Sequence, residues 1–387
     1  MENFAYHNPT RLYFGRQAID ELSDELEKYG QTILLVTGGG SVKRMGLYDT
    51  VMKLLHRGGK TVIELPGISS NPKYTHVLEG QRLCREHHVD LILAVGGGSC
   101  IDAAKGIAAA AMMDGDVWEY FLSRASVERA LPVATILTIP ATGSEMNGNA
   151  VISRWDTKEK VAVYGNALYP AFSILDPVYS FSVPASHTVY GAIDIIIHAL
   201  EHYFVPPTET PLLDYLTEGL VRTAVDSVRR VLRDPCDYDA RANLMFAATV
   251  ANGPSIGLGK QADWASHRIE HELSALYDVP HGAGLAVVYP NWMTYAAEKD
   301  PSRFAHFARA AWDVPAELED DMAAAKAGIA QMRAFFTEIG APATLEQLGV
   351  PADQIPHMAR QAVRFGALGS YCKLDAAAVE QILNMCR

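Results

Sequence analysis

The sequence is poor in cysteine and has no long hydrophobic run. Its five cysteines are odd in number, widely separated and never in a C-x-x-C pair, so neither a disulfide framework nor a cysteine zinc site is expected. We expect them to be buried small hydrophobic residues in a reducing compartment. They are Cys84, Cys100, Cys236, Cys372 and Cys386.

Features that the sequence lacks argue against a membrane partner, against secretion and against a nucleic-acid partner. No stretch of about 18 apolar residues runs without a charge or a glycine, so we expect no membrane partner. The first residues, 1–4, lack the basic and apolar regions of a secretory signal, which predicts a cytoplasmic location. Lys plus Arg number 33 against 45 Asp plus Glu, a formal charge of -12, and no basic run could follow a phosphate backbone, so no nucleic-acid partner is expected.

The 387 residues provide enough chain for two or three compact units, and the pattern changes near residue 183. Up to that point, short apolar runs alternate with helical stretches. Apolar strands without alternation, separated by helices, are typical of a parallel sheet buried on both faces. Residues 1–183 are therefore predicted to form a doubly wound α/β domain. The predicted strands are 32–36, 61–65, 91–95 and 135–139, with a hairpin of 151–154 and 161–163 around the polar turn 156–159.

Residues 184–387 show long segments of 3.6-residue period and almost no strand-like run, which predicts an all-helical domain. The expected helices are 212–231, 240–251, 262–276, 322–339 and 376–385.

Two glycine-rich turns follow predicted strands, Gly38–Ser41 and Gly96–Ser99. In an open α/β sheet, ligands bind outside the carboxyl ends of the strands, where glycine allows close backbone approach and the next helix offers free N–H groups. One such turn is weak evidence, but two in the same topological position favour a nucleotide site. Neither turn is a G-x-G-x-x-G fingerprint, and no P-loop motif is present.

The first turn also bears on the type of cofactor. Sites that select NAD place an acid against the ribose 2′-hydroxyl, whereas a 2′-phosphate needs that acid absent and donors or cations present. Gly39 and Ser41 occupy the turn, with Lys43 and Arg44 behind it. This composition favours NADP over NAD, although Lys43 and Arg44 could equally form a solvated face.

A third segment, Pro140–Glu145, follows the predicted strand 135–139 with small residues and hydroxyls. It could line a ribose or nicotinamide pocket. Alone, it would also suit an ordinary capped helix start.

The second half carries a constellation of one aspartate and several histidines. Asp194 and His198 stand four residues apart on one face of an apolar helix, where an unpaired carboxylate is costly. His267 and His271 repeat that spacing, and His281 begins another helix. Three imidazoles and a carboxylate suit Fe²⁺, Zn²⁺, Co²⁺ or Mn²⁺ in a catalytic site.

Any single one of these histidines could instead cap a helix or pair with a carboxylate, and for His202, one turn after His198, that reading is preferred. For the group of Asp194, His198, His267 and His281 the metal site is the better interpretation. Because these four fill the ligand set, His271 is predicted to act beside them, as a proton relay. A metalloprotease motif starting at His271 fails at Ala275, and no G-x-S-x-G motif is present.

Taken in order, these motifs resemble the iron-containing (group III) alcohol dehydrogenases, particularly the branch of butanol dehydrogenases and NADPH-dependent aldehyde reductases. The resemblance covers essentially the whole chain. The matching segments are Asn8–Gly15, Gly38–Lys43, Gly96–Asp102 with Lys105, Pro140–Glu145, Leu175–Pro177 and the metal segments.

The resemblance implies specific roles for residues of this chain. It places the metal ligands on Asp194, His198, His267 and His281. The implied cofactor contacts are Gly39 and Ser41 for the adenosine ribose phosphate, Gly97, Gly98, Ser99 and Asp102 for the pyrophosphate region, Thr138, Thr142 and Ser144 near the nicotinamide, and Lys160 on the hairpin. A cleft between the two domains and a homodimer are also implied.

The expected function is hydride transfer between NADPH and an aldehyde or primary alcohol, butanol-like in size, with Fe²⁺ or Zn²⁺ as Lewis acid and His271 as proton relay. Two alternatives stay open. A lyase of the dehydroquinate synthase type shares the two-domain plan but should carry extra cations around the metal, and Arg268 is the only one nearby. A noncatalytic metal-binding protein would explain the ligands without the glycine turns.

Overall fold

The computed structural model describes all residues from Met1 to Arg387, which divide into two compact units. The α/β unit comprises His7–Pro184 and Asp234–Thr249, and the helical unit comprises Met1–Tyr6, Ala185–Arg233 and Val250–Arg387. The chain thus passes from the α/β unit to the helical unit after Pro184, but residues 234–249 belong with the α/β unit. The division into a dinucleotide-binding α/β domain of residues 1–183 and a metal-binding helical domain of residues 184–387 stays a prediction.

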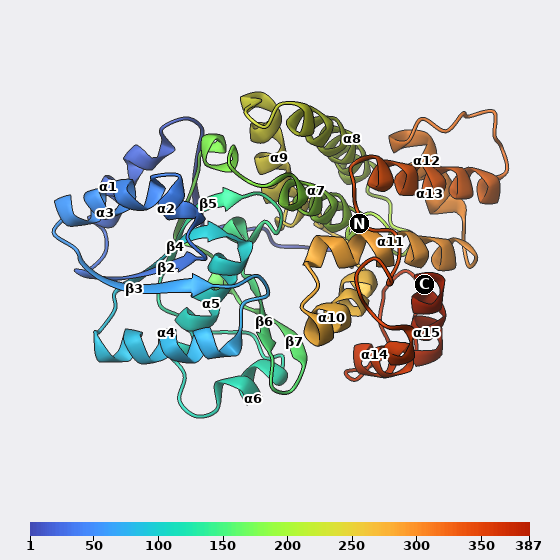
Figure 1. Ribbon diagram of the computed structural model, residues 1–387. Helices are drawn as coiled ribbons and strands as arrows, with labels where there is room; N and C mark the ends of the chain where they lie inside the picture. Colours follow the sequence, from blue (N-terminus) through green and yellow to red (C-terminus); the bar gives the residue numbers. More distant parts are fainter. The chain divides into compact units, whose positions relative to one another are not determined.

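The α/β unit is built on a six-stranded sheet in the order β1-β8-β5-β4-β2-β3 (Figure 1). Every neighbouring pair is parallel, which confirms the predicted doubly wound sheet. The strands are β1 (Arg11–Phe14), β2 (Thr32–Gly38), β3 (Thr61–Ile68), β4 (Leu91–Gly97), β5 (Val133–Ile139) and β8 (Phe172–Leu175). Strands β1 and β8 were not among the predicted ones.

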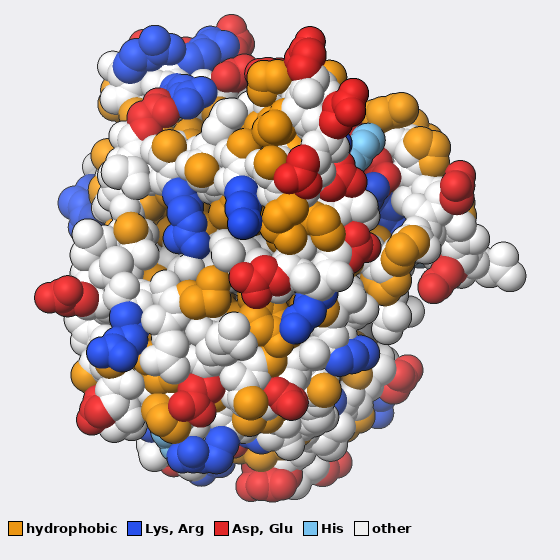
Figure 2. Space-filling view, turned by 90° about the vertical axis from the view of Figure 1, so that its right-hand side faces the viewer, with side chains coloured by type: hydrophobic (Ala, Val, Ile, Leu, Met, Phe, Trp, Pro, Cys, Tyr) orange, Lys and Arg blue, Asp and Glu red, His pale blue; other side chains and the backbone are white.

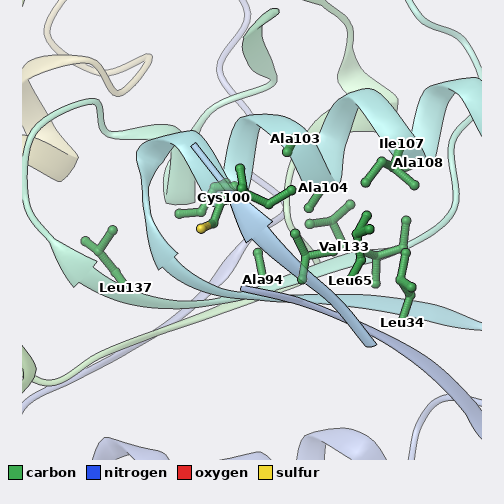
Figure 3. Packing of buried hydrophobic residues seen from close by; sticks show 14 of the residues in the cluster. Leu34, Leu65, Ala94, Cys100, Ala103, Ala104, Ile107, Ala108, Val133 and Leu137 are labelled. Atoms are coloured by element: carbon green, nitrogen blue, oxygen red, sulfur yellow. The ribbon is translucent and has the colours of Figure 1, made fainter. Parts of the chain in front are cut away.

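Both faces of this sheet are covered by apolar helix faces. Along β2, Ile33 and Leu35 belong to one buried cluster and Leu34 and Val36 to another, as the two-residue period of a strand requires. The second cluster packs under α5, as Figure 3 shows. The helices of this part are α1 (Leu22–Leu26), α2 (Ser41–Arg44), α3 (Leu47–Arg57), α4 (Tyr74–Glu86), α5 (Gly98–Ala111) and α6 (Val117–Leu122).

The sheet reverses its winding direction between β2 and β4. From β2 the chain goes to β3 on one side, whereas β4, β5 and β8 follow on the other. Ligands of open α/β sheets bind at the carboxyl ends of the strands that flank such a reversal. Both glycine-rich turns lie at these two strand ends.

A two-stranded antiparallel hairpin accompanies the sheet. It consists of β6 (Asn149–Arg154) and β7 (Glu159–Tyr164), so the predicted hairpin and its turn are confirmed.

The helical unit consists almost entirely of α-helices. The predicted segments agree with the structure to within a few residues, and the largest difference is at the start of α10. There Trp264 has a left-handed φ of 60° and the Asp263 carboxylate accepts the N–H of Ala265, so the helix begins at Ala265 instead of residue 262. None of the helices combines the length and apolar composition that crossing a bilayer needs. The helices from α7 onward are α7 (Ala185–Glu201), α8 (Pro211–Arg233), α9 (Tyr238–Ala251), α10 (Ala265–Tyr277), α11 (His281–Ala297), α12 (Ser302–Ala311), α13 (Asp321–Glu338), α14 (Ile355–Ala362) and α15 (Ala376–Met385).

All five cysteines are free thiols, but the expectation that all are buried is wrong. Cys236 is exposed because it lies in the turn before α9, and Cys372 is half-buried. On the face drawn in Figure 2, acidic and basic side chains are interspersed among hydrophobic ones.

Candidate functional site

Three helices of the helical unit bring the predicted metal ligands together. Asp194 and His198 come from α7, His267 from α10 and His281 from the first turn of α11. One ligand atom each of Asp194, His267 and His281 lies within 4.8 Å of the others. Measured from Asp194 Oδ1, the nearest ring nitrogens are His198 Nδ1 at 3.5 Å, His281 Nε2 at 3.6 Å and His267 Nε2 at 3.9 Å.

Three of the converging atoms are buried and lack hydrogen-bond partners. Asp194 is 3% exposed, and its Oδ1, His198 Nδ1 and His267 Nε2 make no hydrogen bond. Buried polar atoms are almost always bonded, because desolvating them without compensation is unfavourable. A divalent cation coordinated by these atoms would remove that cost. The donor set therefore fits the metal that the sequence predicts.

Two buried glutamates lie behind the imidazoles. His267 Nδ1 is 2.7 Å from Glu201 Oε1, and the same carboxylate accepts hydrogen bonds from Trp264 N and Ser266 Oγ. His281 Nδ1 bonds the Glu270 carboxylate in the same way. When Nδ1 donates to a carboxylate, the lone pair of Nε2 is free for a metal and the ring orientation is fixed. Each glutamate thus points one Nε2 toward Asp194.

The electrostatics of the cluster follow from its burial and its charges. Burial alone would raise the pKa of Asp194, but His198, His267 and His281 hold it well below its usual value. Burial lowers the pKa of His198 to about 3 in spite of the nearby Asp194 carboxylate. Burial also acts to lower the pKa of His267, but Asp194 and Glu201 outweigh it and raise that pKa to about 9.

His271 lies beside the ligand set, and His202 packs on Trp264, whose ring also contacts His198 and His267. His271 is 7% exposed, and its ring centroid is 5.7 Å from that of His281. Ligand atoms of Glu270, His271 and His281 also lie within 4.8 Å of one another. The His202 ring stands edge-on to Trp264 at 5.4 Å, and burial lowers its pKa to about 4.

The sequence reasoning missed Glu201 and Glu270, although their spacing was informative. Glu201 follows Asp194 by two helical turns on the same face, and Glu270 follows His267 by three residues. Both are fully buried, where a carboxylate needs a partner.

In the α/β unit, the second glycine turn is closely packed where its backbone approaches a neighbour, whereas the first turn has only ordinary contacts or open space. A Cβ at Gly96 would lie 2.5 Å from Cys100 Sγ, and one at Gly98 would lie 2.3 Å from Thr142 Oγ1. Gly39, in contrast, faces open space, and Ser41 is exposed. Helix α5 begins at Gly98, so its first N–H groups lie at the second turn.

The other predicted cofactor residues either make hydrogen bonds within the α/β unit or lie, buried or half-buried, near the strand ends. Asp102 accepts hydrogen bonds from Ser144 Oγ at 2.7 Å and Val151 N at 3.0 Å, so both of its oxygens are engaged within the unit. Thr142 Oγ1 accepts the N–H of Ser144. Lys160 Nζ bonds Asn71 Oδ1 at 3.0 Å, after the end of β3. Gly97 and Ser99 are half-buried at the second turn, and Thr138 is buried near the end of β5.

Comparison with known proteins places this geometry in a family. The family model for iron-containing alcohol dehydrogenase matches residues 9–177, and its C-terminal counterpart matches residues 188–386. The chain belongs to the iron-containing alcohol dehydrogenases.

The chain is similar to its relatives over nearly their full length. The chain is 42% identical to probable NADH-dependent butanol dehydrogenase 1 of Bacillus subtilis, over 99% of each chain. It is 40% identical to NADH-dependent butanol dehydrogenase A of Clostridium acetobutylicum, again over 99% of each. It is 35% identical to the NADPH-dependent aldehyde reductase YqhD of Escherichia coli, over 95% and 94%.

The fold of this alcohol dehydrogenase also matches a solved structure. NADH-dependent butanol dehydrogenase A of Thermotoga maritima superposes with a TM-score of 0.95 at 39% identity, covering 100% of this chain and 99% of that one. The protein is an oxidoreductase of the NAD(P)-linked alcohol dehydrogenase and aldehyde reductase type, and its family implies a divalent metal and a nicotinamide cofactor.

Proposed function

We propose that this enzyme interconverts an aldehyde and a primary alcohol of about butanol size, with NADP(H) preferred over NAD(H) and Fe²⁺ or Zn²⁺ as its metal. The observation that carries the proposal is the approach of ring nitrogens of His198, His267 and His281 to Asp194 Oδ1 within 3.5–3.9 Å, with Asp194 Oδ1, His198 Nδ1 and His267 Nε2 buried and without hydrogen bonds. The relatives give no support to the lyase alternative, because each one reported above is named as a dehydrogenase or a reductase.

The roles of the metal-site residues follow from their contacts. Asp194 and the three imidazoles would hold the cation, while Glu201 and Glu270 keep His267 and His281 oriented. A bound nicotinamide supplies the hydride, and a divalent cation polarises the carbonyl oxygen as a Lewis acid.

Reduction of an aldehyde consumes one proton in addition to the hydride. His271 is the candidate for moving that proton, because its ring is buried beside His281 and one turn after His267 on α10. It is not needed to complete the ligand set.

The cofactor residues are proposed from the two glycine turns and the loop after β5. Gly39 and Ser41 would take the adenosine ribose phosphate, Gly97, Gly98 and Ser99 the pyrophosphate, and Thr138, Thr142 and Lys160 the nicotinamide half. Asp102 and Ser144 bond each other, so we propose that they shape this wall of the site.

The preference for NADP rests on the absence of an acid near the first turn. Residues 38–45 contain no acidic side chain, and β3 ends in Ile68 followed by two serines. The nearest carboxylate on β3, Glu64, already accepts the hydroxyl of Tyr48 at 2.9 Å. The first turn and the end of β3 therefore carry no acid of their own to bond a ribose 2′-hydroxyl or to repel a 2′-phosphate.

The activity is tested by following NADPH absorbance with butyraldehyde on the metal-loaded protein. Turnover is expected, and the His267→Ala variant is expected to lose both bound metal and activity. Retained metal content with full turnover in that variant would refute the ligand assignment. Absence of turnover in the wild type with any aldehyde and either cofactor would refute the function.

Cofactor choice is tested with Ser41→Asp. The new carboxylate should lower the NADP/NAD ratio of kcat/KM by on the order of tenfold or more, because it repels the 2′-phosphate and can accept a ribose hydroxyl. Ser126→Asp, on the exposed loop after α6, adds the same charge elsewhere and should leave the ratio unchanged. An unaltered ratio in Ser41→Asp would contradict the proposed cofactor contact.

A cytoplasmic location and a homodimer complete the proposal. The dimer is tested by sedimentation of the metal-loaded protein, where a monomer at micromolar concentration would contradict it.

A further inference from the structure

Lys105 on α5 has no exposed surface and all its polar contacts are to one loop. Its Nζ lies within hydrogen-bond distance of five oxygen atoms of the segment that joins β5 to β6, called here the β5–β6 loop (residues 140–148), and of the first residue of β6. These are Ser144 O at 2.6 Å, Ser144 Oγ at 2.9 Å, Asn147 O at 2.7 Å, Asn147 Oδ1 at 3.3 Å and Asn149 O at 2.8 Å.

Two other residues of α5 hold the same region. Asp102, one turn before Lys105, bonds Ser144 Oγ and the N–H of Val151. Gly98, one turn before Asp102, lies so close to Thr142 that a Cβ there would clash with Oγ1 at 2.3 Å. Residues 98, 102 and 105 follow the spacing of one helix face. A single helix therefore carries the second glycine turn at its first residue and anchors the β5–β6 loop along its length.

The charge of Lys105 is balanced locally. Asp102 and Glu145 are both buried carboxylates whose charges act on the Lys105 ammonium. Desolvating an ammonium group is unfavourable, and it is tolerated only where paired charges and saturated hydrogen bonds compensate. Here the compensation consists of the two carboxylates and the oxygen atoms around Nζ, so the loop conformation in which those oxygens point at Nζ is favoured.

From this geometry we infer that Lys105 is a positioning residue for the cofactor. Its ammonium group ties the β5–β6 loop to α5 and so holds Thr142 against the glycine turn at Gly98, where the pyrophosphate and the nicotinamide half of the cofactor would meet. The inference rests on the proposed function, since that function makes these residues a cofactor site. No contact between Lys105 and the cofactor is required.

The α/β unit offers a matched control in Lys60. This lysine is also buried, and its Nζ donates to two carbonyls, Tyr29 O at 2.8 Å and Gly30 O at 2.9 Å. It directly precedes β3 and thus lies at the amino end of the strands, away from the glycine turns. Loss of its ammonium group should reduce stability without reaching the cofactor residues.

The test measures the NADPH dissociation constant by fluorescence titration, together with melting temperature and metal content, in the wild type, Lys105→Met and Lys60→Met. Lys105→Met is expected to raise the dissociation constant by roughly tenfold or more, because small displacements of positioning groups are costly. The cofactor KM should rise and the aldehyde KM should not. Lys60→Met should lower the melting temperature but keep the wild-type affinity, and metal content should be unchanged in both.

Equal cofactor affinity in Lys105→Met and Lys60→Met would overturn the inference. If Lys105→Met does not fold, Asn147→Ala serves in its place, since it removes one acceptor of Lys105 and leaves the buried charges paired; its affinity should fall, and wild-type affinity would overturn the inference. Failure of the wild type to bind NADPH or NADH would instead refute the proposed function itself.

Discussion

Single side chains decide where the metal ligands point. The imidazoles of His267 and His281 each have one nitrogen on a buried glutamate and the other directed at Asp194. A histidine held this way loses little freedom when a cation binds, which strengthens binding. We therefore expect the glutamates to affect metal affinity although they would not touch the metal.

Replacing Glu201 by Gln tests this role. The amide cannot accept from His267 Nδ1, Ser266 and Trp264 as the carboxylate does, so metal affinity should fall by roughly 10–100-fold. Competition with a chelator measures it. Glu218→Gln is the control, because Glu218 is also buried in the helical unit but bonds the hydroxyl of Tyr203. Equal losses in the two variants would show that the effect is one of general stability.

A second single residue, Glu25, gives the α/β unit a pH dependence. Burial alone would raise its pKa, but hydrogen bonds from Lys28, Tyr13 and Arg11 outweigh this and lower the pKa to about 2. Because the folded pKa lies below the unfolded value of about 4.3, the carboxylate stabilises the fold above that pH and loses this contribution as the pH falls toward 2.

Glu25→Gln should therefore destabilise the protein by about 1 kcal/mol at pH 7, a modest value because Arg11 and Lys28 are largely exposed. The difference from the wild type should shrink between about pH 4 and pH 2. Urea unfolding at several pH values measures it. Glu79→Gln breaks an exposed, solvent-screened pair in which Arg82 also lowers the pKa of Glu79, so its pH-dependent difference should have the same sign but be smaller. A constant difference at all pH values would contradict the assignment.

At the scale of elements, the metal centre depends on how closely α7 and α11 approach. Gly282 follows the ligand His281 and lies against the backbone of α7, where a Cβ would be 2.1 Å from Tyr190 O. Only glycine permits this approach. The distance between the helices sets the distance between Asp194 and His281.

Gly282→Ala is expected to push α11 away from α7, and so to lower both melting temperature and metal affinity. The control is Gly219→Ala on α8, where a Cβ meets no atom within 4 Å. That change should stabilise the protein by roughly 0.5–1 kcal/mol, because alanine is the better helix former. Thermal unfolding and chelator competition measure both effects. Wild-type metal affinity in Gly282→Ala would show that the helix spacing is not limiting.

The sequence predicted those elements whose local pattern is strong. The central strands β2 and β4 are continuous apolar runs, and long helices such as α13 and α15 have clear periodicity. Strands β1 and β8 have four residues each, too few to show a pattern, and β1 is a partly exposed edge strand. The attachment of α9 to the α/β unit depends on contacts with distant residues, which local periodicity does not contain.

The candidate site, like the fold, contains residues that the sequence predicted and residues that it did not. The ligand spacing of four residues on α7 could be recognised because it repeats the helical period. The role of Lys105 could not, since a lysine in a helix is ordinarily exposed, and the only signal for Glu201 was its spacing of two helical turns from Asp194. Their burial becomes apparent only when the helices that cover them are in place.

For the whole molecule, the metal is expected to couple to stability. The buried ligand atoms form a site only in the folded chain, so a bound cation stabilises the fold by mass action, about 2.7 kcal/mol at a free concentration 100 times its dissociation constant. Removing it with a chelator should lower the melting temperature measured by calorimetry. His267→Ala, with a broken ligand set, should not respond. An equal response in that variant would show that the chelator acts at another place.

Helix α9 has a consequence for how the protein is made. Met245 is fully buried in the sheet's core cluster, and the hydroxyl of Thr249 bonds the buried carboxylate of Glu145 at 2.6 Å. The α/β half of the chain thus includes residues 234–249, which are synthesised long after its final strand. A nascent chain that has emerged only to residue 184 leaves uncovered the apolar surface that α9 later buries. The segments of α7, α8 and α9 must therefore be synthesised before that half can complete its core.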